Sequence, residues 1–237
     1  MSAASTPSPP VPVVALDDVV AVIGRFPALA GASLSVERSE IVLLRGANGA
    51  GKTTLLRLCA GLLPVERGVG RVLGFDLATQ RTLVRPHVGL LGHQNGLYLD
   101  LTVRDNVSFW GDTVGATAAE IDAAMGRMGV ADRLADVPTR TLSAGQRRRT
   151  SLACLIARRS QVWLLDEPHA GLDADARDEL DATLRQAAAA GATILVASHE
   201  LERAGTLATR TVDVVAGQVR ATTPDVANPS TNSEREP

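Results

Sequence analysis

The stretch Gly46-Ala47-Asn48-Gly49-Ala50-Gly51-Lys52-Thr53 fits the phosphate-binding pattern GxxxxGK[ST]. Its glycines allow the backbone to approach phosphate groups closely, with several N–H groups pointing inward. The apolar run Ile41–Leu44 predicts a buried strand that enters the loop, and residues 53–58 predict a helix whose positive end faces the phosphates. This order favours a nucleotide-binding P-loop over a glycine-rich turn that carries a lysine by chance.

The polar groups of this loop have specific expected roles. Lys52 is the only lysine in the 237 residues, and the other strongly basic residues are all arginines. The planar fork of an arginine cannot replace a compact ammonium in a phosphate cradle, so we expect Lys52 to reach the β- and γ-phosphate oxygens. Thr53 is expected to offer its hydroxyl to Mg²⁺. The predicted nucleotide-binding residues are Gly46, Ala47, Asn48, Gly49, Ala50, Gly51, Lys52, Thr53 and Thr54.

Composition limits the classes of function. The chain is 45% hydrophobic but only 3% aromatic, so it can bury a core yet offers few rings for stacking nucleic-acid bases. A formal net charge of −2 and a pI near 6.1 give no basic footprint, and we expect no nucleic-acid partner. No apolar run reaches the roughly 18–20 residues that cross a bilayer. Cys59 and Cys154 lie in apolar helical runs and are expected to pack in the core.

The order of the predicted elements gives the fold class. Residues 13–36 alternate apolar and polar side chains, which predicts antiparallel strands ahead of the P-loop. Two apolar runs, 162–165 and 193–196, each follow helical sequence, as is typical of parallel βα units. We therefore predict an α/β fold. It has a P-loop NTPase core with a mixed or parallel sheet, an N-terminal antiparallel β subdomain and a helical insert.

We expect one nucleotide-binding domain over residues 13–224. The segments 1–12 and 225–237 are polar and carry prolines, which predicts disordered tails. A strand is predicted at 85–91, and a helical subdomain at about 98–150.

Two helical patterns are clear in the sequence. Ile121, Met125 and Met128 recur at helical spacing and predict an apolar face that packs in the core. Residues 177–190 predict a helix that ends at Gly191.

The run Val162–Glu167 ends a predicted strand in two carboxylates. Successive side chains of a strand point in opposite directions, so Asp166 and Glu167 cannot do the same job. We expect Asp166 to hold Mg²⁺, and Glu167 to be the base that orients and polarises an attacking water. The alternative is that the pair only caps the following helix.

The pentapeptide Leu142-Ser143-Ala144-Gly145-Gln146 resembles LSGGQ, the signature of ATP-binding-cassette ATPases. A helix that opens with a serine and small residues is an anion site at its N-terminus. The resemblance implies that Ser143, Ala144, Gly145 and Gln146 contact the γ-phosphate held by the P-loop of a second copy. By itself the pentapeptide is also compatible with an ordinary N-cap, but its place between a P-loop and a strand that ends in Asp-Glu is specific to this superfamily.

Other motifs of the superfamily follow in order. Gln94 resembles the Q-loop glutamine that binds Mg²⁺ and water, and Asp173 resembles the D-loop aspartate that reaches across the dimer. His199 resembles the switch histidine that contacts the γ-phosphate, which implies Glu167 and His199 as the catalytic pair. The remaining histidines, which we expect to be structural, are His87, His93 and His169.

The adenine site departs from the superfamily pattern. Most members stack adenine on an aromatic residue ahead of the P-loop. Here Ile23 stands at that position, with Phe26 close to it. The adenine contact is therefore expected from either Ile23 or Phe26.

Several segments resemble the ATP-binding subunit of the cytochrome c maturation haem exporter: Gly92–Gln94, Leu101–Trp110, the LSAGQ pentapeptide and Val162–Pro168. The resemblance implies ATP and Mg²⁺ as cofactors, a head-to-tail homodimer and a separate, CcmB-like transmembrane permease subunit. It implies a cytoplasmic location, peripheral on the inner face of the cell membrane. The alternatives are the ATPase of another exporter, of drugs or lipids, and a soluble ATPase of Fe–S cluster assembly. A simple P-loop kinase is disfavoured by the signature and His199.

Overall fold

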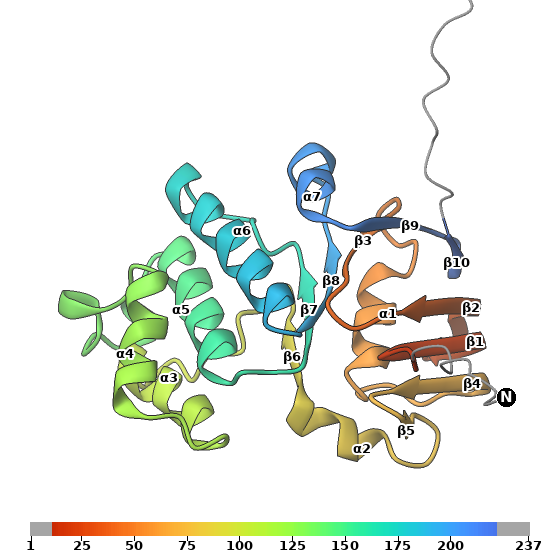
Figure 1. Ribbon diagram of the computed structural model, residues 1–237, viewed down its shortest axis with the longest axis horizontal. Coiled ribbons are helices and arrows are strands. Elements are labelled where there is room, and N and C mark those ends of the chain that lie inside the picture. The colour runs from red at the N-terminus through yellow and green to blue at the C-terminus, as the bar shows by residue number, and fades with distance from the viewer. Residues whose placement is uncertain (1–10, 222–237) are drawn as a thin grey trace, which may run out of the picture.

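The computed structural model describes residues 11–221, and the predicted disordered tails lie outside this range except for residues 11 and 12. Figure 1 shows two sheets and a group of helices that lie beside each other in three parts. The six-stranded sheet stands between a helical part and a four-stranded antiparallel sheet. The predicted α/β fold with an N-terminal antiparallel subdomain and a helical insert is confirmed.

The smaller sheet contains the antiparallel strands predicted ahead of the P-loop. Its strand order is β2-β1-β4-β5. Alternate residues of β1 are buried because one face of this sheet packs on the core. The bounds are Val14–Ile23 for β1, Phe26–Val36 for β2, Arg67–Val72 for β4 and Phe75–Asp76 for β5.

The larger sheet has the order β10-β9-β3-β8-β7-β6. Its neighbours from β9 to β6 pair in parallel, and β10 pairs with β9 in antiparallel fashion, so the sheet is mixed. The bounds are Ile41–Arg45 for β3, Val88–Leu91 for β6, Val162–Asp166 for β7, Thr193–Ala197 for β8, Arg210–Val215 for β9 and Gln218–Ala221 for β10.

The two faces of this sheet belong to two different cores. Along β7, Val162 and Leu164 join the core shared with the antiparallel sheet. Trp163 and Leu165 join the core shared with the helical part. This period of two explains why the strand reads as a continuous apolar run, since both of its faces are covered.

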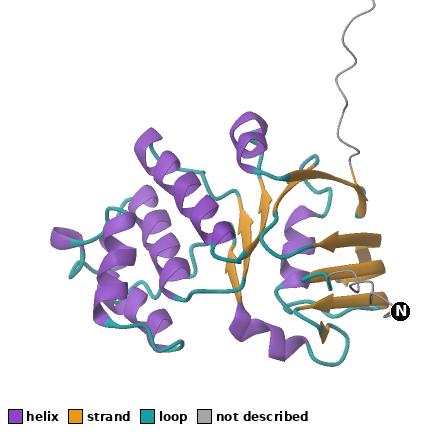
Figure 2. Ribbon diagram, viewed as in Figure 1, coloured by secondary structure: helices purple, strands orange, loops and turns teal. Residues whose placement is uncertain are grey.

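The helices lie on both sides of the large sheet and pack in different cores. Figure 2 shows one helix, α1, between the two sheets, and α3 to α6 on the other side of the large sheet. The bounds are Lys52–Cys59 for α1, Arg81–Val84 for α2, Val103–Asp112 for α3, Ala118–Arg127 for α4, Ala144–Ala157 for α5, Ala174–Ala189 for α6 and Leu201–Leu207 for α7. Short 3₁₀ turns occupy Arg85–His87, Asp132–Leu134 and Thr139–Thr141.

Helix starts in the helical part are fixed by local hydrogen bonds. Thr102, Thr117 and Ser143 each begin a helix with a capping box, in which the hydroxyl accepts from the third helical N–H and that residue's side chain accepts from the cap. The predicted apolar face of α4 is buried, because Ile121 and Met125 pack in the helical core.

Three expected boundaries differ from the structure. The strand expected at 85–91 begins only at Val88, because Pro86 lacks the N–H that a strand ladder needs and lies in a 3₁₀ turn, Arg85–His87, instead. The helix α5 continues to Ala157, beyond residue 150, where we expected the helical region to end. The helix α6 starts at Ala174, ahead of the expected residue 177, because Asp173 caps it.

Candidate nucleotide-binding site

Four loops at the carboxyl edge of the parallel strands converge on one cavity of about 440 Å³. This edge is where ligands bind in open α/β sheets. The loops follow β3, β6, β7 and β8. The cavity is lined by Ala28, Ala47, Asn48, Gly49, Ala50, Gly51, Lys52, Thr53, Thr54, His93, Asp166, Glu167 and His199.

Glycine is required at two positions of the P-loop. Gly46 has a φ of 157°, and a Cβ there would lie 2.2 Å from the carbonyl oxygen of Val214. Gly51 has a φ of 112°, in the left-handed region, and caps α1 without a side-chain hydrogen bond. The first helical N–H groups of α1 have no partner within the helix and remain free to bind an anion. No acidic side chain lies in the first turn of α1, which suits the same purpose.

Lys52 lies inside this loop. The residue is only 7% exposed. Its Nζ donates to Gly46 O at 2.7 Å and to Ala47 O at 3.1 Å. The two carbonyls hold the ammonium within the cradle that the glycines form. A phosphate in the cavity would add the charge-assisted partner that this buried cation lacks.

Asp166 and Thr53 bring the strand β7 to the P-loop. The Thr53 hydroxyl donates to Asp166 Oδ2 at 2.7 Å, and both residues line the cavity. A hydroxyl and a carboxylate are hard oxygen donors of the kind that Mg²⁺ prefers. The donor set therefore fits the metal that the sequence implied, although Gln94 does not contribute to it here.

Glu167 has an unusual backbone and a free acceptor atom. Its φ is 48°, in the left-handed region that is rare for residues other than glycine. One carboxylate oxygen, Oε2, accepts from the His199 N–H at 3.1 Å and from the Ser198 hydroxyl at 3.4 Å. The other, Oε1, is buried without a hydrogen bond in residues 11–221 and lies 3.4 Å from His199 Nε2. A carboxylate oxygen that accepts no hydrogen bond in a phosphate cavity is suited to polarise a water.

The loop after β6 reaches the cavity through a different residue from the one expected. Gln94 is exposed and does not line the cavity. His93, which we expected to be structural, does line it. The only sequence feature that pointed to His93 as a cavity residue was its position next to Gln94. Of the other two, His169 is buried and its Nε2 lies 2.7 Å from Asp181, whereas His87 stacks on Phe75.

The signature residues lie outside the cavity. Ser143 caps α5, and Ser143 and Ala144 are exposed. A Cβ at Gly145 would lie 2.8 Å from Gly171 O, so the signature and the segment leading to Asp173 touch each other. Arg149 forms an ion pair with Asp173, which also caps α6. Within one chain, the signature and the D-loop thus form a unit separate from the phosphate cavity.

The adenine candidates lie at the turn between β1 and β2. Ile23 is 46% exposed and Phe26 is 79% exposed. Neither lines the phosphate cavity, whereas Ala28 of the same hairpin does. An exposed ring or aliphatic group beside that hairpin remains the predicted adenine contact.

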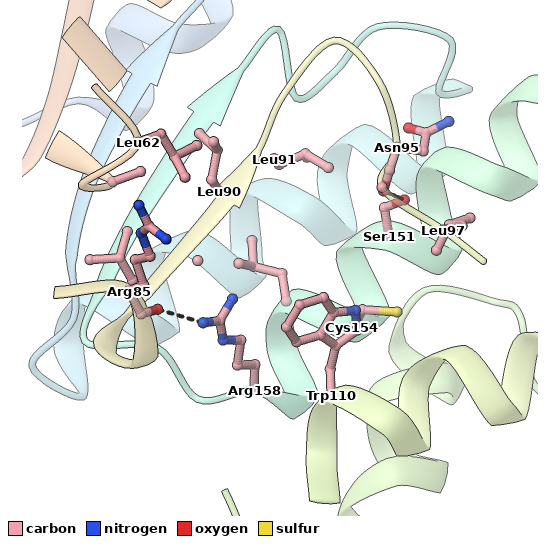
Figure 3. Close-up of a pocket in the computed structure, with 15 residues that line it drawn as sticks. Leu62, Arg85, Leu90, Leu91, Asn95, Leu97, Trp110, Ser151, Cys154 and Arg158 are labelled. Atoms are coloured by element: carbon pink, nitrogen blue, oxygen red, sulfur yellow. Dashed lines mark hydrogen bonds between the residues drawn. The ribbon is translucent and has the colours of Figure 1, made fainter. Parts of the chain in front are cut away.

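A second cavity, of about 300 Å³, lies between the large sheet and the helical part (Figure 3). Trp110 of α3 faces Arg158, which follows the end of α5, and the guanidinium carbon lies 4.8 Å from the ring centre. Arg158 donates to Arg85 O at 2.5 Å, and burial lowers the pKa of its guanidinium. Asn95 and Leu97 place the loop after β6 along one wall of this cavity.

The unique lysine allows a direct labelling test of the cradle. We expect Mg-ATP to protect Lys52 from an amine-acylating reagent, because the bound phosphates cover Nζ. At 100 times the dissociation constant only about 1% of the protein is free, so labelling falls up to about 100-fold. Peptide mapping measures the label, and labelling of Lys52 without nucleotide is the reference. Equal labelling of Lys52 with and without Mg-ATP would contradict the site.

Comparisons with known proteins agree with this geometry. A family model described as ABC transporter matches residues 29–170. The chain is 41% identical over 169 residues to the cytochrome c biogenesis ATP-binding export protein CcmA of Nitrobacter winogradskyi, covering 71% of this chain and 82% of that protein. It is 38% identical over 198 residues to the human phospholipid-transporting ATPase ABCA7, covering 81% of this chain and 9% of ABCA7. A solved ATP binding subunit of an ABC transporter has a TM-score of 0.80 at 26% identity, covering 88% of each chain.

The family match covers most of the residues that line the cavity, and only Ala28 and His199 of that lining lie outside the matched segment. The matched segment begins in β2 and ends after Glu167, and it therefore contains the P-loop, the signature and both carboxylates. The chain belongs to the ABC transporter family and is an ATPase of the ATP-binding-cassette type.

Proposed function

We propose that two copies of this chain close head to tail on a separate membrane subunit and hydrolyse ATP to drive haem export or delivery for c-type cytochromes. The ATPase part of this proposal rests on one observation. Four side chains with suitable chemistry line the same cavity: Lys52, Asp166, Glu167 and His199. The resemblance to CcmA supports the haem half. No helix in residues 11–221 is long and apolar enough to span a membrane.

The proposed chemistry assigns one role to each side chain of the cavity. Lys52 and the N–H groups of α1 bind the β- and γ-phosphates, and Thr53 and Asp166 hold Mg²⁺. When bound, the metal neutralises charge that develops on the phosphate oxygens. Glu167 orients the attacking water through its free oxygen, and His199 contacts the γ-phosphate beside it.

The dimer is supported by the place of the signature. Ser143 to Gln146 form a helix N-terminus without acidic side chains in its first turn, which is suited to bind an anion. Because they do not line the cavity of their own chain, they are available to the ATP of a second copy. Asp173 lies beside them and would contact that copy together with them.

The membrane subunit is proposed to dock on the helical part. Tyr98, Leu99 and Phe109 are each 44–50% exposed there, and the rings of Tyr98 and Phe109 pack edge to face at 5.2 Å. These apolar side chains lie near the cavity of Figure 3, where Leu97 and Trp110 are found. An exposed apolar patch on a water-facing protein marks an interaction site. We propose a short cytoplasmic segment of the membrane subunit as its occupant.

Inactivation of the gene tests the haem assignment. We expect mature c-type cytochromes to disappear, because an undriven exporter subunit cannot supply haem for their assembly. Haem-stained gels of membrane fractions measure this loss, and a plasmid copy of the wild-type gene should restore the bands, whereas the E167Q copy should not. Normal haem staining in the inactivated strain would exclude the haem assignment and leave the ATPase assignment intact.

A second candidate is the ATPase of a lipid exporter. The observation that favours it is the identity to ABCA7, a phospholipid-transporting ATPase, which extends over 81% of this chain. Purification of this chain with its membrane subunit distinguishes the two. Stimulation of ATP hydrolysis by phospholipid in place of haem would favour the lipid candidate.

A further inference from the structure

Arg148 is a buried cation on the second turn of α5, the helix that starts with the signature. It is 5% exposed. Its Nη2 donates to Asp166 O at 2.7 Å and to Glu167 O at 2.6 Å, and its Nε lies 3.5 Å from Pro168 O. One guanidinium therefore binds the backbone on both sides of the proposed base.

The other side of the same guanidinium binds the loop after β6. Its Nη1 donates to Gly92 O at 2.7 Å and to Asn95 Oδ1 at 3.4 Å. The adjacent Ser151 hydroxyl donates to Asn95 O at 2.7 Å, and Figure 3 shows these two residues side by side. Arg148 thus connects three segments: the signature helix, the end of β7 and the loop that carries Gln94.

The charge of Arg148 is stabilised almost wholly by carbonyl oxygens. It forms no ion pair with a carboxylate within the part of the chain that the structure describes, although Asp166 and Glu167 are near enough to favour its charged form. Burial lowers the pKa of the guanidinium to about 10, so it remains charged near neutral pH. A charge is costly to bury unless it is paired or hydrogen-bonded. A buried guanidinium is explained here if it holds, through its hydrogen bonds, a backbone segment that would otherwise leave its conformation.

Glu167 has such a backbone. A residue other than glycine held in a sparsely populated φ region is strained, and it persists only where its surroundings fix it. The Glu167 N–H donates to Ala197 O at 2.8 Å, which fixes one side of the residue. Arg148 binds its carbonyl, which fixes the other side.

We infer that Arg148 is a positioning residue for the reaction: it holds the main chain of Glu167 in its left-handed conformation and thereby places the carboxylate against the phosphate cavity. The inference rests on the proposed role of Glu167 as the base. A lysine cannot replace Arg148, because a single ammonium cannot serve the carbonyls bound by Nη1 and those bound by Nη2 at once. The cation is kept by that substitution, but the fork is lost.

The test compares R148K with R147K, the same substitution at the preceding residue. Arg147 is partly exposed and its side chain has no partner among residues 11–221. We expect R148K to lower kcat on the order of 100-fold, because a base misplaced by about 1 Å costs that much. The KM for ATP should change by less than about threefold, since the P-loop is untouched. R147K should match the wild type in both constants.

Two further measurements separate positioning from loss of folding. Slow hydrolysis with intact ATP binding should accumulate the ATP-bound dimer of R148K in gel filtration, whereas a misfolded protein would not. Adding R148K to E167Q should lower the residual turnover no further, because both changes act on one group. If R148K does not fold, R148A with added methylguanidine replaces it, and recovery of kcat by that guanidinium is the expected result.

Each remaining outcome has one meaning. Wild-type kcat in folded R148K overturns the inference, as does a kcat loss that the unfolded fraction or a matching rise in KM accounts for. Failure of methylguanidine to restore any turnover to folded R148A also overturns it. Wild-type turnover in E167Q overturns the base assignment itself, and this control is read before the R148K data.

Discussion

E167Q is expected to bind ATP with wild-type affinity, to lose turnover and to accumulate as a dimer with ATP enclosed. An amide keeps the size of the side chain and an oxygen that can accept from the His199 N–H, so the loop after β8 stays in place. It cannot accept the proton of the attacking water. Loss of a general base costs about 10²–10⁴ in rate, and we expect a loss in that range.

The dimer follows from the same argument. In the proposed dimer, ATP closes the two copies because each signature binds the phosphate of the other, and hydrolysis is the step that separates them. If the base is removed and the phosphate sites remain, the closed state persists. Single-turnover hydrolysis and gel filtration with Mg-ATP measure the two effects on one sample.

Glu66 offers a control for this substitution. It is exposed and lies between α1 and β4, away from the cavity. E66Q changes the net charge of the chain by the same amount as E167Q and should hydrolyse ATP like the wild type. A residual rate of E167Q close to that of E66Q would remove Glu167 from the mechanism, and another group would have to activate the water.

Local patterns in the sequence were sufficient for much of the site. The P-loop was predictable because a strand, a glycine turn and a helix follow each other within a short stretch, and their geometry depends on near neighbours. Asp166 was predictable because it ends a buried strand, and parallel strands bring their carboxyl ends to one edge. His199 was expected from its resemblance to the switch histidine of the superfamily, and it follows the strand β8. The structure places both on the cavity with Lys52.

The role of Arg148 was not predictable from the sequence. It sits in a run of three arginines, and no local rule distinguishes the buried one from its neighbours. Its partners are main-chain carbonyls of segments far away in the chain. Every residue type has such a carbonyl, so the sequence does not indicate which carbonyls accept hydrogen bonds from Arg148. Likewise, we expected Gln94 at the cavity, and His93 lies there instead. Which of the two lines the cavity depends on the conformation of the loop after β6, which the sequence does not specify.

K52R is the second variant with a large expected effect, and it tests why the chain keeps one lysine. The substitution preserves the charge, yet we expect it to weaken ATP binding by about 10- to 100-fold. That range corresponds to the loss of one charge-assisted hydrogen bond of about 1.5–3 kcal/mol. The guanidinium is too wide to lie between Gly46 O, Ala47 O and a phosphate at the place that Nζ occupies.

The matched control is the opposite substitution, arginine to lysine, further along α1. Arg57 is exposed, and R57K alters a cation on the same helix without touching the P-loop. Equilibrium binding of a fluorescent ATP analogue gives the affinities. The ATP-induced rise in unfolding temperature gives an independent measure, since ligand binding stabilises by RT ln(1 + [L]/Kd).

The two variants together decide between charge and shape in the cradle. If charge alone mattered, K52R would bind ATP as well as R57K and the wild type, and only K52A would fail. If shape matters, K52R is as weak as K52A while its unfolding temperature without ATP is unchanged. We expect the second result, because the two carbonyls around Nζ leave room for an ammonium and not for a planar fork.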